Sequence, residues 1–351
     1  MEKKEIRGRG SDHNPPNPFL KNRFDDDIIE GIDEPWQKQQ IQTQIIEEFP
    51  KQILSKNDSP DLPFTYSINP YQGCEHGCVY CYARSTHNYW GLGMGLDFES
   101  KIIVKRNAAD LLEKSFLKKT WKPQSIMLSG NTDCYQPIEK NLQITRSILK
   151  VFEQYQNPVG IITKNSLILR DLDVLKELSE SRLVKVFITI TTMDENIRRR
   201  LEPRASSFHK RLKVIEELSR RNIPVGVMIG PVIPGLTEHE MDTIMKNAAN
   251  SGALDASYTV LRLNGDLGQM FERWAEKNFP DRSDKILNKV REVHNGNLHD
   301  NKWLRRLRGE GKIADIIAKM YEVSKGKYYT NRQFPETNFN AFRKLGNLNL
   351  F

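Results

Sequence analysis

The sequence predicts an α/β protein built around a parallel β-sheet. Short apolar runs alternate with longer segments of helical periodicity between residues 64 and 265. The runs are apolar throughout, which is typical of the strands of a parallel sheet covered by helices. About six strand–helix units fit into this stretch, fewer than the eight of a complete TIM barrel.

The expected strands are short and rich in β-branched residues, and a helix follows most of them. We expect strands at 64–68, 125–129, 159–163, 183–191, 224–229 and 256–263. The intervening helices are expected at 143–155, 171–180, 208–220 and 238–250, and Asp171 is a candidate N-cap. Because catalytic groups of parallel barrels lie at the carboxyl ends of strands, the loops after these strands are the candidate site.

The ends of the chain differ from this core. Residues 1–35 are dominated by Gly, Pro and charge, which predicts an extended arm, and the polar residues 55–61 predict a linker. Helical spacing returns at 271–279, 285–294 and 313–323, followed by a tail at 334–351. We therefore divide the chain into an arm and linker (1–62), a core (63–265) and a helical C-terminal extension (266–351).

Charge and hydropathy limit the class of protein. The chain has 53 Lys and Arg against 45 Asp and Glu, a net charge of +8, which permits a polyanionic partner without requiring one. No stretch is apolar for long enough to span a bilayer, and the N-terminus lacks the apolar region of an export signal. We expect a cytoplasmic enzyme with no membrane association.

Three of the four cysteines lie within eight residues, in the pattern CxxxCxxC. Cys74, Cys78 and Cys81 follow the first expected strand directly, and Cys134 follows the second. An iron–sulfur cluster normally takes four cysteine ligands. Three thiolates therefore leave one iron open to another ligand, which favours a reactive cluster over a purely conductive one.

A structural zinc site is the alternative explanation of these cysteines. His76 or His87 would complete a tetrahedral set, but no second CxxC or HxxxH pair follows. Disulfides are disfavoured because cysteines are few and closely spaced in a chain expected to be cytosolic.

The CxxxCxxC spacing, with Tyr80 before the last cysteine, resembles the signature of the radical S-adenosylmethionine (SAM) superfamily. The resemblance implies a partial, open (β/α)6 barrel of TIM type across the whole core. It also implies that the three cysteines bind a 4Fe–4S cluster and that SAM chelates the open iron. One electron, from a donor such as flavodoxin or ferredoxin, would cleave SAM and start hydrogen abstraction from a substrate.

Two loops are candidates for holding the methionine end of SAM. Many family members carry Gly-Gly-Glu after the second strand, whereas this chain has Asn131, Thr132 and Asp133, whose oxygens suit an ammonium group. A polar turn explains them equally simply. Lys164, after the third strand, would pair with the SAM carboxylate or be a solvated lysine.

Later strands supply the remaining candidates. Thr189 and Thr191 share one face of the fourth strand and would reach the methionine or ribose, although threonine also favours strands for its own sake. Glu202 and Arg204 would contact ribose hydroxyls and the carboxylate, or form an ion pair at a helix end. Gly230 belongs to a Gly- and Pro-rich strand end that suits a platform for adenine, or a tight bend.

Three features together are similar to the spore photoproduct lyase branch of this superfamily. They are Thr-Lys after strand three, a hydroxyl pair on strand four and the motif Glu-Pro-x-x-Ser-Ser-Phe-x-x-Arg-Leu. That branch includes bacterial proteins of unknown substrate, and the lyase itself acts on a thymine dimer in DNA. A cysteine near the end of strand two returns a hydrogen atom there. This chain has Gly130 at that place, and Cys134 four residues later is the candidate donor.

A second function remains open from the residues alone. Basic and aromatic residues interleave at 303–308, and 198–200 is Arg-Arg-Arg. Such patches suit phosphate contacts as well as solvated helix faces. The alternative to a radical SAM enzyme is therefore a non-catalytic nucleic-acid-binding protein with a zinc-stabilised loop, and nucleic acid is also a possible substrate of the enzyme.

Overall fold

A parallel sheet forms the centre of the computed structural model, which describes residues 8–20 and 41–344. In the described part, this sheet has seven strands in the order β10-β9-β8-β7-β6-β3-β2, and only β2 is antiparallel to its neighbour. The strands are β2 (Leu54–Lys56), β3 (Tyr66–Ile68), β6 (Ile126–Leu128), β7 (Val159–Thr163), β8 (Val184–Ile190), β9 (Val225–Val232) and β10 (Ala256–Val260). β10 and β2 are its two edges, so the sheet stays open.

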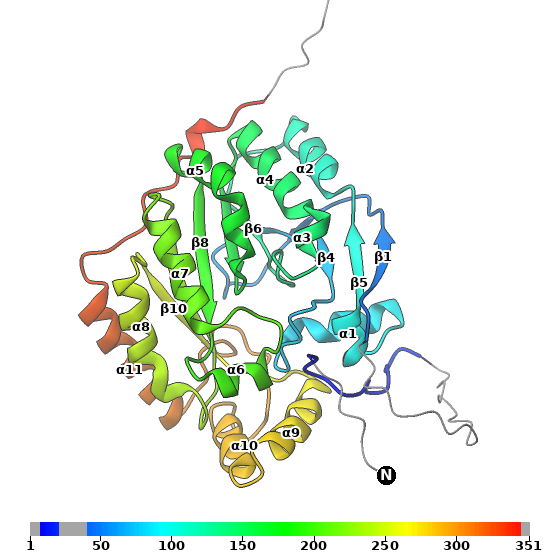
Figure 1. Cartoon of the computed structure of the whole chain (residues 1–351), viewed down its shortest axis with the longest axis vertical. Coiled ribbons are helices and arrows are strands. Elements are labelled where there is room, and N and C mark those ends of the chain that lie inside the picture. The colour runs from blue at the N-terminus through cyan, green and yellow to red at the C-terminus, as the bar shows by residue number, and fades with distance from the viewer. Residues whose placement is uncertain (1–7, 21–40, 345–351) are drawn as a thin grey trace, which may run out of the picture.

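Helices connect the parallel strands and cover one face of the sheet (Figure 1). They are α2 (Ala108–Leu117), α4 (Ile144–Tyr155), α5 (Leu172–Glu180), α7 (Phe208–Ser219) and α8 (Met241–Asn250). The apolar residues of α4 recur at helical spacing and are buried, and they join the strands in one core cluster. This packing makes the α/β architecture expected from the sequence, with six parallel strands, a finding that confirms the open TIM-like barrel.

The six strands lie where their β-branched runs predict, with ends shifted by a few residues. Asp171 occupies the predicted N-cap position of α5, but it does not cap the helix with its side chain. Its side chain makes no cap hydrogen bond and instead accepts bonds from Arg146 and Arg170. A short 3-10 helix, η2 (Ser166–Asp171), precedes α5, so the first turn of α5 is not a free end.

The N-terminal part contributes more structure than its composition predicts. β1 (Gln44–Glu48), β5 (Lys101–Lys105) and β4 (Tyr71–Gln72) form a small three-stranded sheet within the described residues. β2 pairs with β3, so Ser55 and Lys56 lie in a strand and not in a linker. Residues 8–20 of the expected arm pack on the core, and the rest of 1–35 lies outside the described ranges.

The C-terminal helices extend the fold next to the expected site. α9 (Leu267–Asn278) and α10 (Ser283–Glu292) pack together, and α11 (Lys312–Tyr328) packs on α8. A second apolar cluster joins Phe271 and Ile286 of α9 and α10 to Cys78 and Tyr80 of the cysteine loop. β8 points toward the end of the molecule where α6 (Glu195–Leu201), α9 and α10 lie (Figure 1). None of the helices in the described ranges combines the length and apolar character that a membrane crossing needs.

Candidate active site

The cysteine loop, residues 74–81, begins just after β3 and β4. Cys74 and Cys78 are buried and Cys81 is partly exposed. The three thiols are near neighbours. Burial raises the pKa of Cys74 well above its usual value, and Asp133, Cys78 and Cys81 raise it further. The loop therefore gathers its sulfur atoms at the carboxyl end of the sheet, as the spacing predicts.

As they stand, the three thiols do not form a closed site for a single ion. Across residues 8–20 and 41–344, no three His, Cys, Asp or Glu side chains are close enough to hold one metal ion. A tetrahedral zinc site draws its sulfurs in to about 2.3 Å from one centre. An iron–sulfur cube holds its ligands at separate corners and needs a wider arrangement.

Burial also determines the protonation of the metal-free loop. It raises the pKa of Cys78 to about 12, with Lys164 opposing and Glu202 and Cys81 adding to the effect. Because a metal ligand must be a thiolate, loading the loop with metal releases protons.

A buried hydrogen-bond network surrounds Tyr80, the residue before the last cysteine. Its hydroxyl donates to Glu202, lies 3.1 Å from the Thr191 hydroxyl and accepts a 2.8 Å bond from Lys164. Lys164 and Thr191 also reach Glu202 Oε1, at 3.0 and 2.8 Å. The Arg211 guanidinium holds the other oxygen of Glu202. Four side chains, from the residues just after β7 and β8, from α7 and from the cysteine loop, thus converge on one carboxylate.

Positive charges outnumber negative charges in this network. Burial opposes ionisation of Glu202, but Arg211 and Lys164 hold its pKa well below the usual range. Burial would lower the pKa of Lys164, yet Cys78, Glu202 and Tyr80 together raise it. Glu202, Lys164 and Arg211 therefore carry one net positive charge beside the cysteine loop. A buried positive excess of this kind favours an anionic ligand group.

Lys164 connects this network to the cysteine loop. Its ammonium group lies 3.5 Å from the Cys78 sulfur. It follows β7, and its backbone N–H donates to Asp133 Oδ2 at 3.0 Å. The position of Lys164 at a strand end, expected from the sequence, thus places it between the thiols and the carboxylate.

The loop after β6 is fixed by internal bonds. Asp133 accepts a 2.7 Å bond from the Thr163 hydroxyl, and its Oδ2 lies 3.4 Å from His76 Nδ1. The amides of Asn131 and Thr132 donate to the side-chain oxygen of Asn69 at 2.6 and 3.4 Å. This loop faces the cysteine loop, as expected, and Asp133 ties it to the end of β7.

The remaining predicted residues divide into two groups. The carbonyls of Thr189 and Gly230 accept bonds from Arg211 and Thr191, at 2.9 and 2.8 Å, so both border the Glu202 network. Arg204 lies apart from Glu202 and pairs with Glu75 of the cysteine loop at 3.2 Å. Its expected partnership with a ribose or carboxylate stays a prediction.

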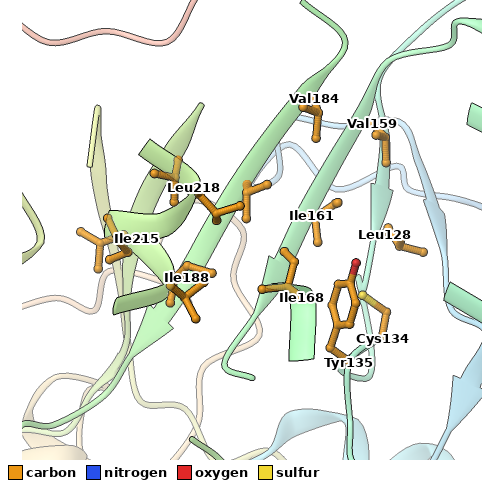
Figure 2. Packing of buried hydrophobic residues seen from close by; sticks show 14 of the residues in the cluster. Leu128, Cys134, Tyr135, Val159, Ile161, Ile168, Val184, Ile188, Ile215 and Leu218 are labelled. Atoms are coloured by element: carbon orange, nitrogen blue, oxygen red, sulfur yellow. The ribbon is translucent and has the colours of Figure 1, made fainter. Parts of the chain in front are cut away.

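Cys134 is not among these groups. Its side chain has no exposed surface and belongs to the main apolar core, and its backbone N–H donates to Ser129 Oγ at 2.5 Å. Figure 2 shows it beside Tyr135, with Leu128 and Ile168 nearby. The structure thus places this thiol within the packing of the strands and helices, and its role as hydrogen donor stays a prediction.

Several residues at the site were not predicted as such. Arg211 lies nine positions after Glu202, inside the segment that carries the resemblance, and its helix α7 aims it at the carboxylate. Tyr82 follows Cys81 directly, and its hydroxyl donates to the Gly130 carbonyl at 2.5 Å. Arg84 and Glu99 form a fully buried ion pair behind the cysteine loop. A buried ion pair of this kind cannot be predicted from a sequence pattern, because only the fold shows which charged side chains face the interior.

Comparisons with known proteins agree with this geometry. A family model described as the Radical SAM superfamily matches residues 68–248. An uncharacterised protein of Mycobacterium tuberculosis is 29% identical over 260 residues, covering 74% of this chain and 75% of that protein. An uncharacterised protein of Methanocaldococcus jannaschii is 31% identical over 225 residues, covering 64% and 80%.

Three further similarities carry more specific names. A protein of Pseudomonas phage M6 named radical SAM Nα-GlyT isomerase is 27% identical over 173 residues, covering 49% of this chain and 34% of that protein. The structure of spore photoproduct lyase with a dinucleoside spore photoproduct matches with a TM-score of 0.55 and 16% identity, covering 81% of this chain and 79% of that one. A variant of that lyase with bound SAM matches with a TM-score of 0.56 and 16% identity, at the same coverage.

Proposed function

Because this chain belongs to the radical SAM superfamily, whose members use a 4Fe–4S cluster and SAM, we propose that Cys74, Cys78 and Cys81 hold three irons of that cluster. SAM would occupy the fourth iron and be cleaved to start hydrogen abstraction from a substrate. That cluster would supply the single electron for this cleavage after reduction by a donor such as flavodoxin or ferredoxin.

The observation that carries this proposal is the position of Lys164. Its ammonium lies 3.5 Å from the Cys78 sulfur and belongs to a buried group with one net positive charge. A carboxylate chelating the open iron would meet this cation, which suits the methionine end of SAM. Glu202, which Arg211 holds by its other oxygen, keeps Lys164 in place, and Thr191 lies within hydrogen-bond distance of Tyr80.

A direct assay tests the reaction. The protein is reconstituted with iron and sulfide without oxygen, reduced with dithionite and given SAM. We expect about four irons per chain, as in a 4Fe–4S cluster, and release of 5′-deoxyadenosine. A Cys78→Ser variant is the matched negative control. Cluster-loaded protein that releases no 5′-deoxyadenosine would contradict the proposed function, and zinc in place of iron would support the binding-protein alternative.

The proposed substrate class is nucleic acid. Three aromatic side chains, Tyr82, Tyr89 and Trp90, are exposed on the 3-10 helix that follows Cys81, η1 (Tyr82–Trp90). Arg262, after β10, lies over the Tyr82 ring at 5.6 Å from its centroid. Exposed rings beside arginines suit unpaired bases, which stack on them. The dinucleoside ligand of the structurally similar lyase and the net charge of +8 support the same class.

Binding of a labelled single-stranded oligonucleotide tests this class. We expect affinity to fall with salt, and Trp90→Ala to weaken it by about 1 to 3 kcal/mol, the usual contribution of one stacked base. Phe339→Ala, at an exposed ring of the C-terminal segment, is the control for loss of an aromatic side chain. Equal affinities of the two variants for the oligonucleotide would show that η1 is not part of the substrate-binding surface. The proposal that the protein cleaves SAM would not be affected by that result.

A further inference from the structure

Residues Gly8–Leu20 form a strap that runs along the outside of the cysteine loop. Gly10 makes the closest approach. A Cβ added at Gly10 would lie 1.8 Å from the Gly77 carbonyl oxygen and 3.0 Å from Val79 Cγ1. Backbone therefore touches backbone at Gly77, which lies between the first and second cysteines in sequence. Only glycine fits at position 10 without moving the loop.

Glu99 of α1 (Leu96–Ser100) joins the strap to the loop. Its Oε2 accepts the Gly10 N–H at 2.8 Å, and its Oε1 accepts the Ser11 N–H at 2.9 Å. A Cβ added at Gly77 would lie 2.8 Å from Glu99 Oε2. The carboxylate thus lies under the turn of the cysteine loop, with the strap bound to it from the other side, and has no exposed surface.

Arg84 completes the connection to a cysteine. It pairs with Glu99 at 2.5 Å, and its Nε donates to the carbonyl oxygen of Cys78 at 2.9 Å. Both side chains of this pair are fully buried. The strap, Glu99, Arg84 and Cys78 are therefore linked by consecutive hydrogen bonds through a fully buried ion pair, and hydrogen bonds are stronger in a buried environment.

The outer side of the strap is fixed to α9, some 265 residues away in sequence. Asp12 pairs with Lys277 at 2.9 Å, and His13 Nε2 lies 3.0 Å from Arg273. His13 O and Asn14 Oδ1 also accept bonds from the backbone N–H groups of Leu96 and Asp97 in the first turn of α1. Next to them, a Cβ added at Gly95 would lie 1.9 Å from the His13 carbonyl oxygen. These contacts hold the strap at both edges of the loop.

We propose that the strap is a positioning element of the cluster site, and that Gly10 and Glu99 fix the backbone of the cysteine loop so that its three thiols keep the geometry of the cluster. The proposal rests on the three cysteines being the cluster ligands. Loosening the strap would let the loop move. The reduced cluster would then be held in a wider range of protein environments, and its lifetime in air would be shorter.

The first test compares two glycine-to-alanine variants of the full chain. Gly10→Ala forces the loop to shift, whereas Gly326→Ala lies in the exposed part of α11 with no atom within 4 Å of the added Cβ. We expect Gly10→Ala to shorten the lifetime of the cluster absorbance in air by about fivefold or more. We also expect a changed electron paramagnetic resonance spectrum of the reduced cluster and faster hydrogen exchange of residues 74–81 in the metal-free protein. Gly326→Ala should match the wild type in all three.

The second test acts at the surface and leaves the fold intact. Asp12→Lys and Lys277→Asp each remove the outer ion pair, and the double variant restores it with reversed charges. Because exposed ion pairs are weak, we expect each single variant to shorten the cluster lifetime by about twofold to fivefold at low salt, and the double variant to recover most of the loss.

The outcomes separate this inference from the proposed function. Wild-type protein that takes up no iron overturns the cysteine assignment itself. A wild type that loads normally, with Gly10→Ala keeping the same spectrum and lifetime, overturns the strap alone. Additive losses in the charge-swapped double variant would likewise show that Asp12 and Lys277 do not act together on the loop.

Discussion

Lys164 and Glu202 form a buried ion pair, 3.0 Å between Nζ and Oε1, that joins the end of β7 to the segment after α6 directly beside the cysteine loop. Glu202 has no exposed surface, and it is the only acidic group among the described side chains that bond to both Lys164 and Arg211. Removing either charge should therefore have effects on both stability and ligand binding.

Replacing Glu202 with glutamine tests the structural part. Lys164 and Arg211 would remain as two buried cations without their carboxylate, which typically costs about 3 to 5 kcal/mol. We expect this loss in the free energy of unfolding of the metal-free protein, measured with urea. Glu217→Gln, at an exposed pair with Arg221, should leave the urea midpoint unchanged. An unfolding curve of Glu202→Gln that overlays the wild type would contradict the role of Glu202 as the shared counter-ion.

Replacing Lys164 with methionine tests ligand binding. The variant keeps the aliphatic length and loses the cation that we assign to the SAM carboxylate. We expect SAM affinity to fall tenfold or more, about 1.4 kcal/mol, while iron content stays at the wild-type value. Equilibrium dialysis with labelled SAM measures this, and Lys176→Met on the exposed face of α5 is the control. A loss of iron with unchanged SAM affinity would assign Lys164 to the cluster loop alone.

Cys134→Ala tests the candidate hydrogen donor. The thiol is buried in the main core, so its loss should lower the free energy of unfolding by about 1 kcal/mol. We expect SAM cleavage to continue in this variant. If Cys134 returns hydrogen to the substrate radical, product formation fails while 5′-deoxyadenosine accumulates. Unchanged product yield would restrict Cys134 to packing.

His294, after α10, gives stability a dependence on pH. It is buried, its Nε2 lies 2.7 Å from the Leu261 carbonyl oxygen, and its Nδ1 has no partner among the described residues. Burial lowers the pKa of His294 below the unfolded value of 6.5. The folded state therefore binds a proton at His294 less readily than the unfolded state does. The contribution of the neutral imidazole to stability is fully present above pH 6.5, and it is lost as the pH falls through the pKa of His294 in the folded protein.

Urea unfolding at several pH values between about 8 and 5 measures this effect, because the unperturbed histidine titrates in that range. We expect His294→Gln to lose less stability on acidification than the wild type. His209→Gln, at an exposed position on α7, serves as the control. Parallel pH profiles of His294→Gln and the wild type would exclude His294 as a source of acid sensitivity.

Local sequence patterns were sufficient for the six parallel strands and for the place of the cysteines. Strand 159–163 was predicted residue for residue, because a β-branched run between clear breaks leaves little choice. The small sheet was missed, since β4 has only two residues and β1 leaves Ile45 and Ile46 exposed, so neither shows the alternation of a half-buried strand. The N-terminal strap was taken for an extended arm because its Gly and Pro residues have no periodicity.

The sequence by itself determined the class of fold, the cysteine triad at the carboxyl end of the first parallel strand and the likeness to radical SAM proteins. These features depend on residue spacing along one short segment, which the chain carries before it folds. Only the tertiary structure decided that Glu202 serves Tyr80, Thr191, Lys164 and Arg211 together, that Cys134 lies in the core, and that Gly10 supports Gly77. Such relationships join residues that lie far apart in sequence, in one case by 122 positions. They depend on burial and close contact, which arise only when the helices pack on the sheet.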